Sequence, residues 1–178
     1  MGSQASAIRL GRLAGLEVSA LPSAVVAFLL LWVVLGVVGI WVLGLSAGEA
    51  IIGGLLGALL HDVAEVLHQL GHAWAARRTG YPMTGIRFWW LLSASLYPEN
   101  EPQLPREVHV RRALGGPIAS AVWSVLSGVI VLALAASSVG GVAWWLALFF
   151  FLDNLLVFTL GSLLPLGFTD GSTLLEHR

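Results

Sequence analysis

Long apolar runs alternate with short polar segments along the chain. Charge-free stretches cover residues 18–48 and 113–152, and a helix needs about 20 apolar residues to cross a bilayer. The second stretch is long enough for two crossings, and turn-forming residues at 137–141 divide it. The apolar run at 50–76 carries polar residues at helical spacing. We therefore predict about four transmembrane helices, at 21–45, 50–76, 113–136 and 142–165.

The segment between the second and third crossings has a different pattern. Residues 81–97 are aromatic and β-branched in their first half and are bracketed by prolines, which favours a short re-entrant β-hairpin at the cytoplasmic side. A plain interfacial anchor made of Trp89 and Trp90 is the alternative. A polar, proline-rich loop follows up to residue 107. Residues 8–20 mix arginine, glycine and apolar positions and predict either an interfacial lead-in segment or a disordered leader.

The composition excludes a water-soluble domain. Of the 178 residues, 57% are hydrophobic and 11% are charged, whereas roughly a quarter of the residues in soluble domains are charged. We predict an all-α polytopic membrane protein with one integral-membrane domain over residues 1–178. We expect the protein to lie in a lipid bilayer and to bind no nucleic acid, and a homo-oligomer is possible. The chain has no cysteine, so a metal site needs nitrogen and oxygen ligands.

The positive charges predict an orientation. All nine basic residues are arginines, and with four crossings every one of them falls on the same side of the membrane. Because cytoplasmic loops are enriched in arginine and lysine, we place both termini and the segment 77–112 in the cytoplasm. The arginines stand at positions 9, 12, 77, 78, 87, 106, 111, 112 and 178.

One face of the second predicted crossing is polar. At about 100° per residue, four ionisable side chains fall within a narrow sector, and two further polar residues lie on its shoulder. Ionisable groups in a bilayer are costly and must face protein or a water-filled cavity. The sector holds His61, Glu65, His68 and His72, and the shoulder holds Asp62 and Gln69. For His61, Asp62 and Glu65 we favour a structural hydrogen-bond seam between helices.

His68 and His72 favour a metal site instead. Histidines four residues apart lie one helical turn apart on one face, so both imidazoles can reach one Zn²⁺ ion. The spacing alone is a weak signal. Asp170 is the candidate third ligand, because Pro165 and Gly167 break the fourth crossing just before it. An ordinary turn at the helix end is the competing interpretation of Asp170. Three protein ligands would leave a fourth zinc position to water, as in hydrolytic sites.

Three motifs resemble those of the site-2 proteases, which are intramembrane zinc metalloproteases. LHQLGHA at 67–73 is similar to the family's HExxH, GGPIAS at 115–120 to its Gly-Pro motif, and SLLPLGFTDG at 162–171 to its NxxPxPxxDG. The lead-in segment and the aromatic stretch after Tyr81 also fit, so the resemblance covers nearly the whole chain in the right order. Each motif is weak alone, and together they are specific.

The resemblance implies one Zn²⁺ per chain, bound by His68, His72 and Asp170 near the cytoplasmic face. It also implies a substrate that is itself the transmembrane helix of a single-pass protein, cleaved in regulated intramembrane proteolysis in a bacterial or archaeal cell membrane. Ser162 stands where the family has an asparagine that stabilises the oxyanion, and its hydroxyl could take that role. Ser120 likewise replaces an asparagine of the Gly-Pro motif.

Substrate binding is predicted at the hairpin after Tyr81. A helix in lipid has all its amides paired, so hydrolysis requires local unwinding and admitted water. An edge strand near 84–92 could pair with the unwound segment by strand addition. The residues predicted to bind substrate there are Ile86, Phe88, Trp89 and Trp90.

Gln69 departs from the family's motif at the position of the catalytic glutamate. In the family that glutamate takes a proton from zinc-bound water and returns it to the leaving amine. An amide can hydrogen-bond the water but cannot accept its proton, so the resemblance predicts an inactive form of a metalloendopeptidase. Either an engineered Glu→Gln substitution or a natural pseudoprotease accounts for it. We favour the former, because both histidines and Asp170 remain.

Two other classes of function stay open. The first is a non-catalytic membrane protein that binds helical clients and uses any metal structurally. The second is a metal transporter with the polar face of the second crossing as its pathway. Four short crossings without a repeated half do not suggest alternating access.

Overall fold

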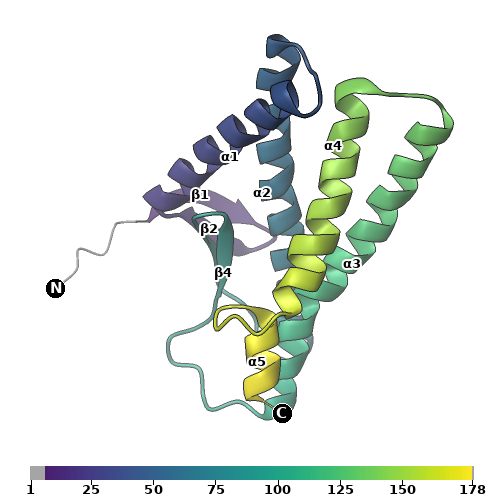
Figure 1. The fold of residues 1–178 in the computed structure, drawn as a ribbon. Helices are drawn as coiled ribbons and strands as arrows, with labels where there is room; N and C mark the ends of the chain where they lie inside the picture. The colour runs from purple at the N-terminus through teal and green to yellow at the C-terminus, as the bar shows by residue number, and fades with distance from the viewer. Residues whose placement is uncertain (1–6, 178) are drawn as a thin grey trace.

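The computed structural model describes residues 7–177, and four of its helices are long and apolar enough to cross a membrane (Figure 1). The helix α4 continues without a break through the π-helix η1 and the 3-10 helix η2. The predicted polytopic helical fold is therefore confirmed. The helices are α1 (Pro22–Trp41), α2 (Ala47–Arg78), α3 (Arg106–Ala136), α4 (Gly141–Leu152), η1 (Asp153–Leu160), η2 (Gly161–Leu163) and α5 (Asp170–Glu176).

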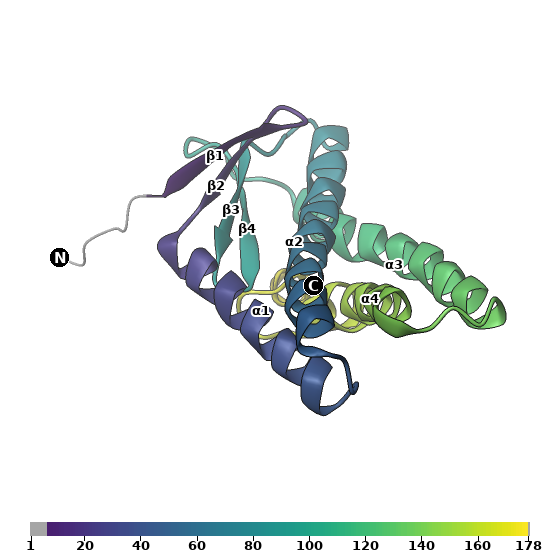
Figure 2. The same cartoon turned by 90° about the horizontal axis from the view of Figure 1, so that it is seen from above.

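Two hairpins together form a four-stranded sheet at one end of the helices (Figure 2). The strands pair in chain order, and only the contact between the second and third strands is parallel. The hairpin after Tyr81 appears as predicted. The strands are β1 (Ile8–Leu13), β2 (Leu16–Ala20), β3 (Gly85–Trp89) and β4 (Leu92–Leu96).

The lead-in segment forms the hairpin β1–β2, so the alternative of a disordered leader is wrong, and its location at the membrane interface stays a prediction. Its turn places Ala14 and Gly15 at positive φ, 50° and 85°. Alanine is not a usual residue at the first of these positions, so Ala14-Gly15 is a weak turn signal and the hairpin was not predicted. Glu17 on β2 accepts from Arg9 at 2.8 Å and from Arg12 at 3.4 Å across the hairpin. The charges that suggested a solvated leader are therefore paired across two strands.

The predicted edge strand is also corrected. β3 pairs with β2 on one side and with β4 on the other, so its backbone has no free edge to offer. The free edges of the sheet belong to β1 and β4. β3 was predicted to be an edge strand because its parallel contact with β2 leaves no local pattern in the sequence. That contact joins segments that lie on either side of two transmembrane helices in the chain.

One face of the sheet packs against α2. Ile86 and Phe88 are buried in this contact, with relative exposures of 0% and 9%, and they meet Ala73 and Ala76 on α2. The alanines have no bulk beyond Cβ, so the sheet lies close to the helix that carries the two histidines.

Glycines allow equally close approach of α2 to its neighbouring helices. A Cβ on Gly71 would collide with the backbone oxygen of Gly115 on α3, and a Cβ on Gly115 would collide with that of Gly71. On the α1 side, a Cβ on Gly54 would lie 2.8 Å from the backbone nitrogen of Gly36. Small residues are the usual means of close helix contact in lipid. They hold α2 between α1 and α3 with its polar face inward.

We expect Gly71→Ala to lower stability strongly, because the added methyl group must push α2 away from α3. Overpacking of this kind costs about 1–3 kcal/mol, measurable as a lower melting temperature in detergent. Gly48→Ala on the same helix is the matched control, because a Cβ there meets nothing within 4 Å. Equal melting temperatures for the two variants would contradict the close α2–α3 contact.

Candidate metal centre

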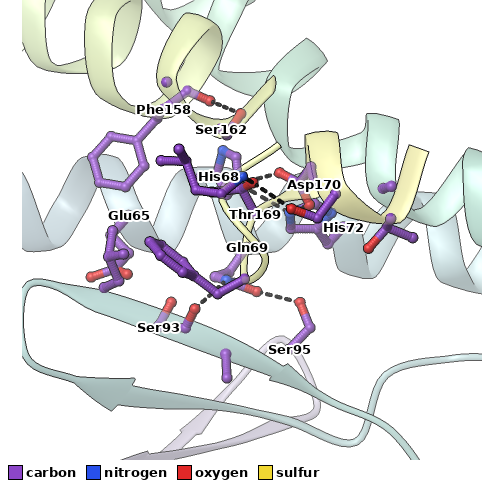
Figure 3. Close-up of a pocket in the computed structure, with 18 of the residues that line it drawn as sticks. Glu65, His68, Gln69, His72, Ser93, Ser95, Phe158, Ser162, Thr169 and Asp170 are labelled. Carbon is purple, nitrogen blue, oxygen red and sulfur yellow. Dashed lines mark hydrogen bonds and ion pairs between the residues drawn. The ribbon is translucent and has the colours of Figure 1, made fainter. Parts of the chain in front are cut away.

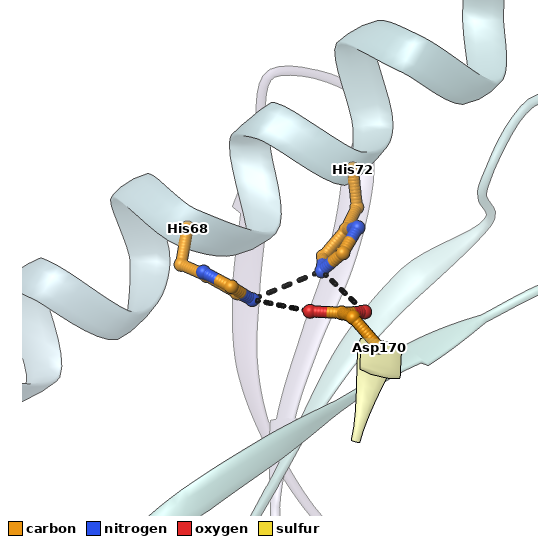
Figure 4. A group of neighbouring side chains, drawn as sticks. All are labelled: His68, His72 and Asp170. Atoms are coloured by element: carbon orange, nitrogen blue, oxygen red, sulfur yellow. Dashed lines mark hydrogen bonds and ion pairs between the residues drawn. The ribbon is translucent and has the colours of Figure 1, made fainter. Parts of the chain in front are cut away.

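His68, His72 and Asp170 converge at one point, as predicted (Figure 4). The two Nε2 atoms lie 3.0 Å apart. Each also lies 3.3 Å from a different oxygen of the Asp170 carboxylate. The histidines project from α2 and the carboxylate from the first residue of α5, so segments about a hundred residues apart build the group.

The loop before α5 positions the carboxylate. The hydroxyl of Thr169 donates to the carbonyl of Leu164 and accepts from the backbone N–H of Leu166. Gly167, at a positive φ of 88°, donates its N–H to Ser172 Oγ at 2.7 Å. Thr169 and Ser172 thus close the loop on itself, and Asp170 is held between them facing α2. Gly171 is required next, because a Cβ there would collide with the carbonyl of Leu163.

The far side of each imidazole is held by α3. His72 Nδ1 lies 2.8 Å from the backbone carbonyl of Arg112, an acceptor, and 3.2 Å from the backbone N–H of Gly116, a donor. The shorter contact, to the carbonyl, favours the tautomer with the proton on Nδ1. His68 Nδ1 lies 3.0 Å from Ser120 Oγ. With both Nδ1 atoms engaged, the Nε2 lone pairs face each other and Asp170. Hydrogen bonds to the distal nitrogen are the usual means of orienting metal-binding histidines. Gly116 leaves room for both rings, because a Cβ there would collide with them.

This arrangement fits a tetrahedral metal ion. Ligand atoms at the usual zinc distances lie about 3.3 Å apart around a tetrahedral centre, close to the three separations observed. Two lone pairs and a carboxylate at such distances repel one another unless a cation lies between them. The three residues can hold a metal ion.

A buried ion pair stabilises the segment behind His72. Arg112, only 5% exposed, donates to both carboxylate oxygens of Glu101, at 2.9 and 2.5 Å. Its guanidinium also donates to the carbonyl of Tyr81 and lies 4.0 Å from the ring centre of Tyr97. The loop 98–105 is thereby tied to the start of α3, whose Arg112 carbonyl orients His72.

A cavity of about 830 Å³ opens beside the metal-binding group (Figure 3). It is bounded by α2, β4, η1 and the loop leading into α5. Its lining is mixed, with serine and threonine hydroxyls near the histidines and apolar side chains farther out. Among the lining residues are Glu65, Gln69, Trp89, Ser93, Ser95, Phe158, Ser162 and Phe168. Both β4 and the metal-binding group therefore border the same cavity.

Gln69 lies in this cavity, but its amide is directed to β4. Its Oε1 accepts from Ser95 Oγ at 2.7 Å, and its Nε2 donates to the carbonyl of Ser93 at 3.3 Å. The side chain is buried, with 5% relative exposure. Gln69 therefore joins α2 to the outer strand of the sheet.

The other predicted site residues have different surroundings. Ser162 lines the cavity, and its hydroxyl donates to the carbonyl of Phe158 at 2.9 Å. Trp89 lines the cavity as well, whereas Trp90 is 55% exposed at the hairpin turn. Ile86 and Phe88 lie in the apolar contact between sheet and α2, away from the cavity lining. The substrate roles predicted for these residues stay predictions.

His61 takes part in a hydrogen-bond seam of the kind that we favoured, whereas for Asp62 and Glu65 the seam stays a prediction. His61 Nδ1 lies 3.0 Å from a carboxylate oxygen of Asp153 on η1, and its Nε2 donates to the carbonyl of Leu91 at 2.9 Å. Phe158 packs against both His61 and His68, with ring centres 5.3 and 5.6 Å apart. Asp153 was not predicted as a partner of His61, although a lone acid inside an apolar crossing was a usable signal.

Arg112 and Ser120 were not predicted as groups that orient the histidines. Ser120 was noted only for its place in the Gly-Pro motif. Its helical spacing from Gly116 could have placed it on the α2-facing side of α3. The contact of the Arg112 carbonyl with His72 could not be predicted from the sequence, because every residue has a backbone carbonyl.

Comparisons with known proteins agree with this site. The chain is 34% identical over 96% of its length to "Putative zinc metalloprotease Rip3" from two strains of Mycobacterium tuberculosis, and covers 43% of each. A site-2 protease from Methanocaldococcus jannaschii has the same fold, with a TM-score of 0.61 and 20% identity over 96% of this chain and 70% of that one. No protein-family model matches the chain. The chain thus spans less than half the length of its mycobacterial relatives. The fold is therefore that of a site-2 protease, and the sequence is similar to that of a putative zinc metalloprotease.

Replacing the carboxylate at the metal-binding group tests the ligand set. We expect Asp170→Ala to reduce bound zinc from about one per chain to a small fraction, measured by elemental analysis of purified protein after dialysis. Glu99→Gln, an exposed acid in the loop after β4, is the control and should keep its zinc. Retention of zinc by Asp170→Ala would exclude this carboxylate as a ligand.

The pH dependence of stability tests the Glu101–Arg112 ion pair. Hydrogen bonds from Arg112 hold the pKa of Glu101 below its usual value. The pair therefore stabilises the fold at neutral pH, and this contribution is lost as the pH falls through the lowered folded-state pKa. We expect Glu101→Gln to lower the melting temperature at neutral pH, with the difference from the unsubstituted protein vanishing in acid. A difference that is the same at both pH values would show that ionisation of Glu101 is not its cause.

Proposed function

We propose that this chain, which has the site-2 protease fold and is similar in sequence to a zinc metalloprotease, is the membrane core of an intramembrane zinc endopeptidase, held inactive by Gln69. Its substrate would be a transmembrane helix of a single-pass protein, cleaved in regulated intramembrane proteolysis. The observation that carries this proposal is the convergence of two histidines and a carboxylate inside the transmembrane bundle, beside a cavity bordered by a strand edge.

The donor set suits zinc. Two neutral imidazoles and one carboxylate are the ligands of many hydrolytic zinc sites, which keep the fourth position for water. Zinc held there would polarise a peptide carbonyl and make water a better nucleophile. The chain's own residues do the rest: Ser120 and the Arg112 carbonyl orient the imidazoles, and the loop closed by Thr169 and Ser172 presents Asp170.

Peptide-bond hydrolysis in lipid also needs an unwound substrate. The free edge of β4 borders the cavity, so an extended segment that adds to this edge would pass the metal-binding group. Trp89 and Phe168, with ring centres 6.3 Å apart, border the same cavity and would flank that segment. Ser162 would support the oxyanion only after its hydroxyl leaves the Phe158 carbonyl.

The proposed orientation follows the arginines. Eight of the nine lie in the described residues, on the sheet, at the end of α2 and in the first turns of α3. These elements share one end of the molecule (Figure 1). With that end in the cytoplasm of a bacterial or archaeal cell, both termini and the metal-binding group lie toward the cytoplasmic side.

A natural pseudoprotease that binds membrane-helix clients without cleaving them is the second candidate. It is favoured by the hydrogen bonds of Gln69, whose donor and acceptor both have partners on β4. An engineered Glu→Gln substitution would not require hydrogen-bond partners for both the N–H and the oxygen of the new amide.

Cleavage of a panel of model transmembrane helices in detergent tests both candidates. We expect Gln69→Glu to cut at least one helix in a chelator-sensitive reaction, at about 10²–10⁴ times the rate of the Gln69 protein, because general base assistance has this size. Zinc content is measured in each protein, and Gln103→Glu in the exposed loop is the matched control.

The outcomes separate the two candidates. Zinc in both proteins and cleavage by neither would favour the pseudoprotease. Absence of zinc from both would contradict the metal-binding assignment on which each candidate is based.

A further inference from the structure

The outward groups of β4 can be identified from the strand register. Phe88 on β3 stands opposite Ser93 on β4, and the carbonyl of Phe88 accepts from Leu21 on the β2 side. The N–H and C=O of one strand residue point to the same side, and antiparallel pairs alternate between bonded and non-bonded. Ser93 therefore directs its backbone N–H and C=O away from β3, to the free edge. Ser95, two residues farther along β4, does the same, whereas Leu91 precedes β4 in the hairpin turn.

Side chains of α2 already occupy part of this free edge. The carbonyl of Leu91 accepts from His61, and the carbonyl of Ser93 accepts from Gln69. Ser95 adds a link through its hydroxyl, which donates to the Gln69 amide oxygen. These contacts are protected from water, because His61 is 6% exposed and Gln69 is 5% exposed.

The match between helix and strand is periodic. Positions 61, 65 and 69 lie on one stripe of α2, and four helical residues advance about 6 Å along the axis. Positions 93 and 95 lie on one side of β4, position 91 precedes them in the turn, and two strand residues advance about 6.6 Å. The two repeats are nearly equal, so the stripe runs in step with the strand edge. Glu65, the middle position, lines the same cavity as Ser93.

We propose that Gln69 and His61 are place-holders on the docking edge of β4, which an incoming extended segment must displace. The inference deepens the proposed function, because the segment would be an unwound part of the substrate helix. The carbonyl of Ser93 is a group that an added strand uses for its backbone pairing, and the carbonyl of Leu91, held by His61, adjoins it in the hairpin turn. The protein thus competes with its substrate for the strand-edge acceptor of Ser93, while His61 occupies the turn beside it.

The amide at position 69 suits this role better than a carboxylate. Gln69 donates to Ser93 and accepts from Ser95 at the same time, whereas an ionised glutamate has no N–H for the Ser93 carbonyl. The residue at this position therefore sets how firmly the edge is occupied, apart from any part in proton transfer. His61 is less suitable for a test, because its replacement would leave Asp153 buried without its partner.

The test is the binding of a strand-forming peptide to the purified protein in lipid nanodiscs. The probe is a fluorescein-labelled octapeptide of alternating threonine and valine, followed by fluorescence anisotropy. We expect Gln69→Met, which keeps the side-chain size but has no amide, to bind the probe about tenfold more tightly, the factor that one displaced hydrogen bond accounts for. Ser95→Ala, which removes one of the two links, should give a smaller gain.

Two controls make the result specific. Gln103→Met carries the same change in an exposed loop and should bind the probe as the unsubstituted protein does. A probe N-methylated at alternate residues cannot pair along one backbone edge and should lose the gain. Hydrogen exchange should show the unmodified probe protecting amides within residues 90–97.

Equal or weaker binding by Gln69→Met than by Gln103→Met would overturn the inference and leave Gln69 a purely structural residue. Binding requires neither zinc nor cleavage, so this failure differs from a failure of the proposed function. If the cleavage panel is negative but Gln69→Met still gains affinity, the place-holder role stands. If cleavage succeeds without any gain, only the place-holder role fails.

Discussion

Polar groups inside a bilayer must find partners within the protein, and this constraint organises the structure around α2. Water is not there to satisfy an imidazole or a carboxyl group, so each one has to face another polar group. The polar face of α2 meets the requirement in two directions. His68 and His72 turn toward Asp170, while His61 and Gln69 turn toward Asp153 and β4. A single amphipathic stripe thus serves both a metal-binding group and the attachment of the sheet.

Close packing of α3 and the sheet against α2 makes these hydrogen bonds possible. Short polar side chains such as Ser120 and Ser95 can touch α2 only if their own backbones lie near it. Glycines at the α2–α3 crossing and alanines under the sheet supply that proximity. Gly116 has two roles: it lies at the α2–α3 crossing, and it leaves the space that the two imidazole rings fill. The apolar contacts and the chemistry of the site therefore depend on the same few small residues.

Features that depend on residues close together in the chain could be predicted from the sequence, whereas most contacts between distant segments could not. The four crossings were readable because hydropathy is a local property, and His68 with His72 because their spacing is one helical turn. Asp170 was reachable through the breaks at Pro165 and Gly167 and through its motif. The pairing of β2 with β3 was not, because it joins segments on either side of two helices and a parallel contact leaves no hairpin signal. The hold of Gln69 on β4 was equally hidden, since it depends on which edge of the strand faces outward.

The pairing of β2 with β3 has a mechanical consequence for the helices. β2 leads directly into α1 and β3 follows shortly after α2, so their hydrogen bonds fasten the two helices together at the sheet end. The short connection at 42–46 fastens them at the other end. The pair α1–α2 is thereby closed into a ring that resists separation in the membrane plane. Sideways access to the cavity must then come from the opposite wall, formed by η1 and the loop before α5, which is joined to α2 by side-chain contacts such as His61–Asp153 and not by strand pairing.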